Sequence, residues 1–176
     1  MVTLADLLHD ADALRTGEFE LASGETSPYY VDVKHACSNP SVLRALAQHA
    51  QVYAVGHDAI AGTALGGVPL AVQLGVETGH PILLVRGEAK DYGTGSRIEG
   101  PVDDAEEVLM VEDVTTTGQS LREAVEAVRD TGASVAHAVT IVDREEGARE
   151  LLTEADVALH ALTTLSELTD ATGVEP

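Results

Sequence analysis

The 176-residue sequence contains one cysteine, Cys37, and two lysines, Lys34 and Lys90. A lone cysteine excludes an intrachain disulfide and the paired cysteines of common zinc sites. No apolar run approaches the length of a membrane-spanning helix, and the first residues include acids rather than the basic residues of a targeting signal. We therefore expect a cytoplasmic protein that does not bind membranes.

Positive charge is scarce along the whole chain. Ten basic residues face 30 acidic ones, which gives a formal net charge of −20 and an isoelectric point near 4.4. This charge repels nucleic acids and anionic membrane surfaces, so we expect neither as a partner. An acid-rich, lysine-poor surface resembles that of halophilic proteins, in which hydrated cations screen the self-repulsion.

The apolar pattern predicts a single domain, residues 1–176, of the α/β class. A helix is expected at 3–14 and an extended run at 29–33. After these, predicted strands alternate with predicted helices, which indicates a mainly parallel, doubly wound sheet with ligands at the carboxyl ends of its strands. The strands are expected at 58–64, 81–86, 108–111, 134–142 and 157–162, and the main helices at 40–50, 69–77, 119–131 and 146–154.

The stretch VLMVEDVTTTGQS, residues 108–120, combines an apolar strand, two carboxylates and a hydroxyl-rich loop before a helix. Backbone N–H groups at the start of a helix bind phosphate readily. Because Glu112 and Asp113 repel phosphate, sugar hydroxyls or a divalent cation should lie between them and the anion. A ribose phosphate with a metal-bound polyphosphate meets both conditions. The alternative is that the two acids only end a strand and cap the next helix.

This stretch resembles the 5-phosphoribosyl 1-diphosphate (PRPP) signature of type I phosphoribosyltransferases. It is neither a Walker phosphate loop nor a GxGxxG dinucleotide turn. The resemblance implies that Glu112 and Asp113 hold the ribose hydroxyls, directly or through a Mg²⁺ ion that PRPP carries, with no direct metal ligand otherwise assigned. It also implies that the loop binds PRPP through Val114, Thr115, Thr116, Thr117, Gly118, Gln119 and Ser120.

The segment FELASGETSPYY, residues 19–30, resembles the N-terminal lid of orotate phosphoribosyltransferases. Three of the five aromatic residues of the chain lie in it, and the resemblance implies that one of them, Tyr30, contacts orotate. On spacing alone the same aromatics also fit a hydrophobic core. Where the family often has a lysine that reaches across a dimer interface, this sequence has Ala22.

A glycine pair follows the predicted strand at 58–64. In ALGGVPLA, residues 64–71, Gly66 and Gly67 allow the backbone to approach a ligand closely. The segment resembles the pyrophosphate loop of the family, which implies that both glycines bind PRPP. Some relatives have lysine at the position of Gly66, so here backbone N–H groups are left to bind pyrophosphate.

The segment RGEAKDYGTG, residues 86–95, opens a glycine-rich loop of about fourteen residues, and loops of that length are usually functional or disordered. It resembles the catalytic loop of orotate phosphoribosyltransferases. Arg86 and Lys90 match PRPP-contacting positions, and Tyr92 stands where many members have histidine. Gly87 replaces a second basic residue that the family usually donates to the neighbouring subunit. The alternative is a solvated surface loop.

Charged residues also follow the predicted strand at 134–142. VDREEGA, residues 142–148, resembles the family segment whose arginine binds the orotate carboxylate, and that position is Arg144. Together with Thr116, Arg144 would position orotate. The alternative is that Arg144 only pairs with Glu145 or Glu146 at the surface.

The resemblance runs from Phe19 to Arg144 and implies the type I phosphoribosyltransferase fold, with residues 1–35 contributing a small lid or hood. It implies a homodimer with shared active sites that converts orotate and PRPP to orotidine 5′-phosphate and pyrophosphate, with Mg²⁺, in pyrimidine biosynthesis. The catalytic residues would be Arg86, Lys90, Glu112 and Asp113. Two alternatives stay open, namely a non-catalytic regulator that senses PRPP or a nucleotide, and a related enzyme that uses a purine or uracil.

The acid-rich composition predicts a dependence on salt. We expect the melting temperature and the activity to fall when salt is removed, because the carboxylates then repel one another without screening. Thermal unfolding followed by circular dichroism across a series of potassium chloride concentrations measures the shift. Full activity and an unchanged melting temperature without added salt would contradict the expected adaptation.

Overall fold

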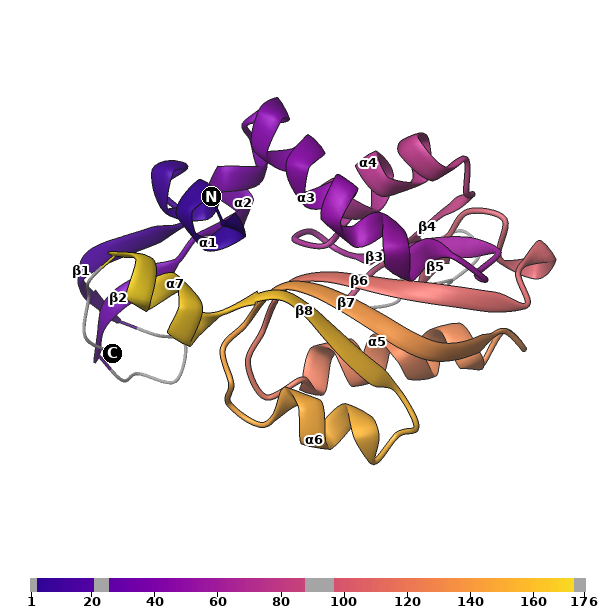
Figure 1. Ribbon diagram of the computed structural model, residues 1–176. Coiled ribbons are helices and arrows are strands. Elements are labelled where there is room, and N and C mark those ends of the chain that lie inside the picture. Colours follow the sequence, from indigo (N-terminus) through magenta and orange to yellow (C-terminus); the bar gives the residue numbers. More distant parts are fainter. Residues whose placement is uncertain (1–2, 21–25, 88–96, 173–176) are drawn as a thin grey trace.

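The computed structural model describes residues 3–20, 26–87 and 97–172. Lys90, Tyr92 and Ala22, for which the sequence made predictions, lie outside these ranges. Within them, helices lie on both faces of a central sheet, and a small N-terminal lobe lies beside one end of it (Figure 1). None of the described helices is long and apolar enough to cross a membrane.

The central sheet has six strands in the order β5-β4-β3-β6-β7-β8. Neighbouring strands are parallel except for β5, which runs antiparallel to β4, so the predicted mainly parallel sheet is confirmed. The chain order of the strands reverses between β3 and β6, and sheets of this kind bind ligands at that point. The strands are β3 (Ala59–Thr63), β4 (Ile82–Val85), β5 (Ile98–Glu99), β6 (Glu107–Thr115), β7 (Ser134–Asp143) and β8 (Ala158–Thr164).

Two hydrophobic cores, one on each face of the sheet, explain the apolar run of β6. Leu109 and Val111 belong to the core beneath α3 and α4, whereas Val108 and Met110 belong to the core beneath α5 and α6. A strand buried on both faces has no polar side to alternate with. The helices are α3 (Pro40–Ala54), α4 (Val68–Thr78), α5 (Gln119–Arg129) and α6 (Ala148–Thr153), and a short 3₁₀ helix, η1 (Val102–Asp104), follows β5.

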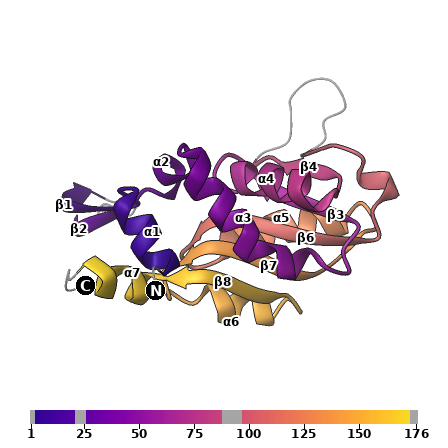
Figure 2. The ribbon, with the colours of Figure 1, turned by 45° about the horizontal axis from the view of Figure 1, so that its top comes forward.

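The N-terminal residues form the small lobe that the resemblance implied. Its two strands pair as an antiparallel hairpin, and the C-terminal helix α7 packs against its first helix. Figure 2 shows the hairpin, α1 and α7 together at one end of the molecule, on the side to which β8 leads. The elements are α1 (Leu4–Asp10), β1 (Leu14–Glu20), β2 (Thr26–Val31), α2 (Val33–Cys37) and α7 (Leu165–Thr172).

Two predictions for this lobe were wrong in their boundaries. The helix expected at 3–14 ends at Asp10, because Asp12 takes a positive φ of 56° and the chain then enters β1. The extended run expected at 29–33 stops at Val31, because the side chain of Asp32 accepts a hydrogen bond of 3.1 Å from the backbone N–H of His35 and starts α2. Helix α2 itself was not predicted.

The strand predicted at 108–111 continues to Thr115. Its partner β7 is longer than expected, and the two strands remain paired through Val114 with Val142 and Thr115 with Asp143. Glu112 and Asp113 therefore lie within β6 and do not follow it. Because successive side chains of a strand point to opposite faces, the two carboxylates leave β6 in different directions.

Candidate functional site

Asp113 lies where β6 meets the glycine turn that follows β3. Its side chain is buried, with 7% exposed. A β-carbon on Gly66 would overlap the Asp113 carboxylate, and one on Gly67 would overlap the carbonyl oxygen of Val111. Position 67 therefore requires glycine, whereas a side chain at position 66 would have to displace the Asp113 carboxylate. The two glycines bring the predicted pyrophosphate turn directly against the predicted ribose-binding acid.

Lys34, on α2, forms an ion pair with Asp113. Its Nζ lies 2.9 Å from Asp113 Oδ2. Partial burial lowers the pKa of Lys34, yet the contact with Asp113 and its negative charge outweigh this effect and raise the pKa above its ordinary value. No sequence motif predicted this contact, and the scarcity of lysine was the one available signal.

Glu112, the second acid, is protonated more readily than an ordinary glutamate. Burial and the neighbouring Asp113 raise the pKa of Glu112 to about 8, against the opposing effect of a hydrogen bond from Thr63. Glu112 Oε1 also accepts a hydrogen bond of 3.0 Å from the backbone N–H of Asp113.

The hydroxyl-rich residues form the loop that the sequence predicted, between β6 and α5. Gly118 precedes the first residue of α5 with a positive φ of 83°, a conformation that favours glycine, and it supplies no side chain to cap the helix. The first N–H groups of α5 are therefore available to an anion. A shallow pocket of about 60 Å³ lies here, lined by Glu112, Val114, Thr115, Thr116, Thr117, Gly118, Gln119, Ser120 and Leu121.

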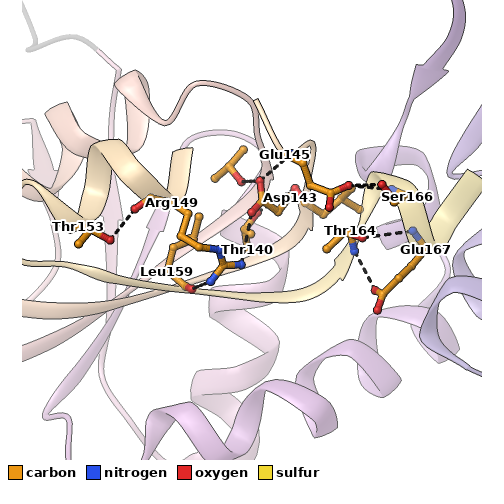
Figure 3. A network of polar contacts seen from close by, with 11 residues as sticks. Thr140, Asp143, Glu145, Arg149, Thr153, Leu159, Thr164, Ser166 and Glu167 are labelled. Carbon is orange, nitrogen blue, oxygen red and sulfur yellow. Dashed lines mark hydrogen bonds and ion pairs between the residues drawn. The ribbon is translucent and has the colours of Figure 1, made fainter. Parts of the chain in front are cut away.

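A polar network fastens the end of β7 beside this loop (Figure 3). Asp143 Oδ1 accepts hydrogen bonds from Thr115 Oγ1 at 3.4 Å and from the backbone N–H of Glu145 at 3.0 Å. Arg149 Nη2 lies 3.5 Å from Asp143 Oδ2, and the Glu145 carboxylate accepts a hydrogen bond of 3.0 Å from the backbone N–H of Ser166. The network joins β6, α6 and α7 around the segment after β7, and sequence reasoning had given Arg149 no role.

Arg144 lies in that segment, next to the hydroxyl loop. Its backbone N–H donates to the carbonyl oxygen of Thr115 at 2.9 Å, and its Nη2 lies 2.8 Å from Glu146 Oε1. The pairing with Glu146 is the one that the alternative interpretation expected. However, only 18% of the Arg144 side chain is exposed, and its Nε is buried with no hydrogen-bond partner among the residues that the structure describes.

Arg86 and Tyr30 lie on other elements around the site. Arg86 directly follows β4, and its Nε lies 3.4 Å from Glu99 Oε1. Tyr30, on β2, is 42% exposed, its ring centre lies 5.7 Å from that of Phe19, and its hydroxyl is one of the groups that act on the pKa of Lys34. Tyr30 thus lies near Lys34, the partner of Asp113.

Glu112 and Asp113 fit a divalent cation only with help from a ligand. In the described ranges, no three His, Cys, Asp or Glu side chains converge to hold a metal. Hard cations such as Mg²⁺ take about six oxygen ligands. Two carboxylates thus suit an ion whose remaining ligands come from water and from a bound polyphosphate.

Residues 40–160 match the model of the phosphoribosyl transferase domain family. The orotate phosphoribosyltransferase of Halobacterium salinarum is 51% identical over 168 residues, which cover 96% of each chain. A crystal structure of orotate phosphoribosyltransferase from Aeropyrum pernix superposes with a TM-score of 0.80 at 30% identity, over 97% of this chain and 99% of that one. One of the Mycobacterium tuberculosis enzyme in complex with PRPP gives 0.78 at 29% identity, over 94% and 96%.

The chain belongs to the type I phosphoribosyltransferase family. The relatives that it matches over nearly their whole length are the orotate phosphoribosyltransferases of that family, one of them from a halophilic archaeon. The family predicted from the signature at 108–120 and from the N-terminal segment is confirmed.

The two glycines of the turn should respond differently to substitution. Gly67→Ala places a methyl group against a backbone atom of β6, so we expect a loss of about 1–3 kcal/mol of stability. Gly66→Ala meets only the Asp113 side chain, which can move, so we expect a smaller loss. Thermal unfolding measures both, with Gly87→Ala as the control because no atom of the described residues lies within 4 Å of its added methyl group. Equal stability of Gly67→Ala and Gly87→Ala would contradict the packing described here.

Proposed function

We propose that this protein transfers the ribose 5-phosphate of PRPP to orotate, giving orotidine 5′-phosphate and pyrophosphate in pyrimidine biosynthesis. The observation that carries the proposal is the meeting of the acid pair, the glycine turn and the hydroxyl loop where the strand order reverses between β3 and β6. Residues 1–176 act as one cytoplasmic domain in this proposal, since α1, α2 and α7 share a core with α3 and α4.

Each motif in the site fits one part of PRPP. Glu112 and Asp113 hold the ribose hydroxyls, and the loop from Val114 to Ser120 binds the 5′-phosphate at the start of α5. The backbone N–H of Gly67 already donates to the carbonyl oxygen of Thr63 at 2.9 Å. The N–H of Gly66, together with Arg86, Lys90 and Tyr92, therefore takes the pyrophosphate end. A Mg²⁺ ion carried by PRPP would neutralise part of the charge on the leaving pyrophosphate.

The charges of the site match the charge that develops in the reaction. As the bond from the sugar to pyrophosphate breaks, positive charge grows on the ribose, beside Glu112 and Asp113, and negative charge grows on the leaving group, beside the basic residues. No covalent nucleophile is required. The lone thiol is unsuited to that role, because burial and then the nearby Asp113 raise the pKa of Cys37 to about 11.

Arg144 favours orotate over the other bases. Orotate carries a carboxylate, which uracil and the purines lack, and the buried Nε of Arg144 is a donor that such a group would satisfy. Thr116 and Tyr30 would orient the ring. A regulator of transcription would need a basic face for DNA, and a chain with a net charge of −20 is poorly suited to that role.

A base-consumption assay tests the activity and the role of Arg144 together. With PRPP and Mg²⁺ at high salt, we expect the protein to consume orotate and to leave uracil, adenine, guanine and hypoxanthine unchanged. Arg144→Gln should lower kcat/KM for orotate by roughly 10- to 100-fold, the effect of losing a hydrogen bond to a charged group. Arg122→Gln is the control, because the Arg122 side chain pairs with Glu126 on the same helix, α5. Consumption of another base, or PRPP binding without any turnover, would overturn the proposal.

We propose further that two chains assemble as a homodimer through α3 and α4. These helices contain a single acid, Glu77, in a chain that has 30. Val52, Val55 and Val76 are 68%, 79% and 71% exposed there, and a hydrogen bond of 2.7 Å between Gln51 and Glu77 brings the two helix ends together. Two strongly acidic chains repel each other least across such a charge-poor, apolar surface. Leu65, 80% exposed, places this surface beside the glycine turn.

Sedimentation at high salt tests this assembly. We expect the wild-type chain to have twice the 18.4 kDa mass of one chain. Val76→Glu should give a monomer, because it buries a charge in the interface. Thr153→Glu adds the same charge on exposed α6, on the opposite face of the sheet, and should leave the dimer intact. A monomeric wild-type protein, or a dimeric Val76→Glu variant, would contradict the proposed surface.

A further inference from the structure

The ion pair between Lys34 and Asp113 occupies the carboxylate that the proposed function assigns to the substrate. Asp113 is almost fully buried, while 61% of the Lys34 side chain is exposed. The oxygen that faces Lys34, Oδ2, has no hydrogen-bond partner among the described residues. A ligand that approaches Asp113 therefore meets the ammonium group of Lys34 first.

The fold holds Lys34 in this position from the N-terminal lobe. On either side of it in α2, Val33 and Ala36 are buried, and Asp32 caps the helix. Arg15 Nη1 lies 3.8 Å from Asp32 Oδ2 and ties the same helix to β1. The backbone of Lys34 is thus anchored, whereas the exposed end of its side chain is free to change partners without disturbing the core.

Resting on the proposed function, we propose that Lys34 is a positioning residue that acts as the counter-ion of Asp113 until the substrate arrives, and that it must be displaced before a divalent cation reaches this carboxylate. A cation that arrives alone leaves the Lys34 ammonium without an anion. A cation that arrives with PRPP also brings phosphate oxygens, to which the ammonium can turn. Lys34 therefore couples the entry of the metal to the entry of PRPP.

This role also bears on the charge of the acid pair. Asp113 and Glu112 lie next to each other in a chain with a net charge of −20, and an unpaired acid pair would attract any divalent cation. With Lys34 on Asp113 and the pKa of Glu112 raised to about 8, the pair does not present two free negative charges near neutral pH. The site is then selective for a cation that comes with its own anionic ligand.

Binding of Mn²⁺ alone, without PRPP or base, tests the proposal and does not depend on activity. In about 1 M potassium chloride the screening length is roughly 3 Å, so that only contact-range charges alter the affinity. We expect Lys34→Met to bind Mn²⁺ about tenfold more tightly than the wild type, as measured by electron paramagnetic resonance of free Mn²⁺. Lys34→Arg should restore the wild-type affinity.

Arg122→Met is the control, since it removes one positive charge from α5, where Arg122 pairs with Glu126. Its Mn²⁺ affinity should equal that of the wild type. Equal Mn²⁺ affinities of Lys34→Met and the wild type would overturn the proposal. Tight Mn²⁺ binding by the wild type would also overturn it, and this measurement does not depend on the folding of any variant. A folded protein that consumes no orotate but shows the expected change would refute the proposed function and leave the counter-ion role standing.

Discussion

The close contact between β6 and the turn after β3 is the constraint on which the rest of the site depends. It exists because Gly66 and Gly67 have no side chains, so that the turn can lie against Asp113 and the backbone of Val111. A larger residue at position 67 would push the turn away from β6, whereas one at position 66 would displace the Asp113 side chain. With the turn in place, groups suited to ribose and groups suited to pyrophosphate lie side by side at the point where the sheet reverses its strand order.

Local pairing of charges solves the problem of building an anion site in a chain with a net charge of −20. Lys34 pairs with Asp113, Arg86 with Glu99, Arg144 with Glu146 and Arg149 with Asp143. Each pair fixes the position of a basic side chain, so that it does not pair with other carboxylates of the acidic surface. A polyanionic ligand then competes with a single carboxylate for each basic side chain, and it binds more strongly because it carries several negative charges.

The sequence was sufficient for those features that local patterns determine. The alternation of strands and helices, the hydroxyl loop before α5 and the glycine turn all depend on residues close together in the chain, and each lies where it was expected. One of the errors was local, since the cap of Asp32 on His35 that begins α2 was missed. Others depend on partners far away in the chain. Thr115 belongs to β6 because β7 continues beside it to Asp143, and the end of α1 depends on how the chain enters the hairpin of the lobe.

The role of Lys34 could not be predicted, because its partner Asp113 is also far away in the chain. This contact changes how the missing basic residues are understood. Ala22, Gly66 and Gly87 stand where relatives often have a base, which suggests a weakened site if charge is counted along the motifs. The structure instead brings a lysine from α2 to the acid pair, and the glycine at position 66 leaves room for the Asp113 side chain that Lys34 meets. Basic residues that are missing from the aligned motifs are therefore not a measure of the positive charge in the folded site. A basic side chain can reach the site from a distant part of the sequence.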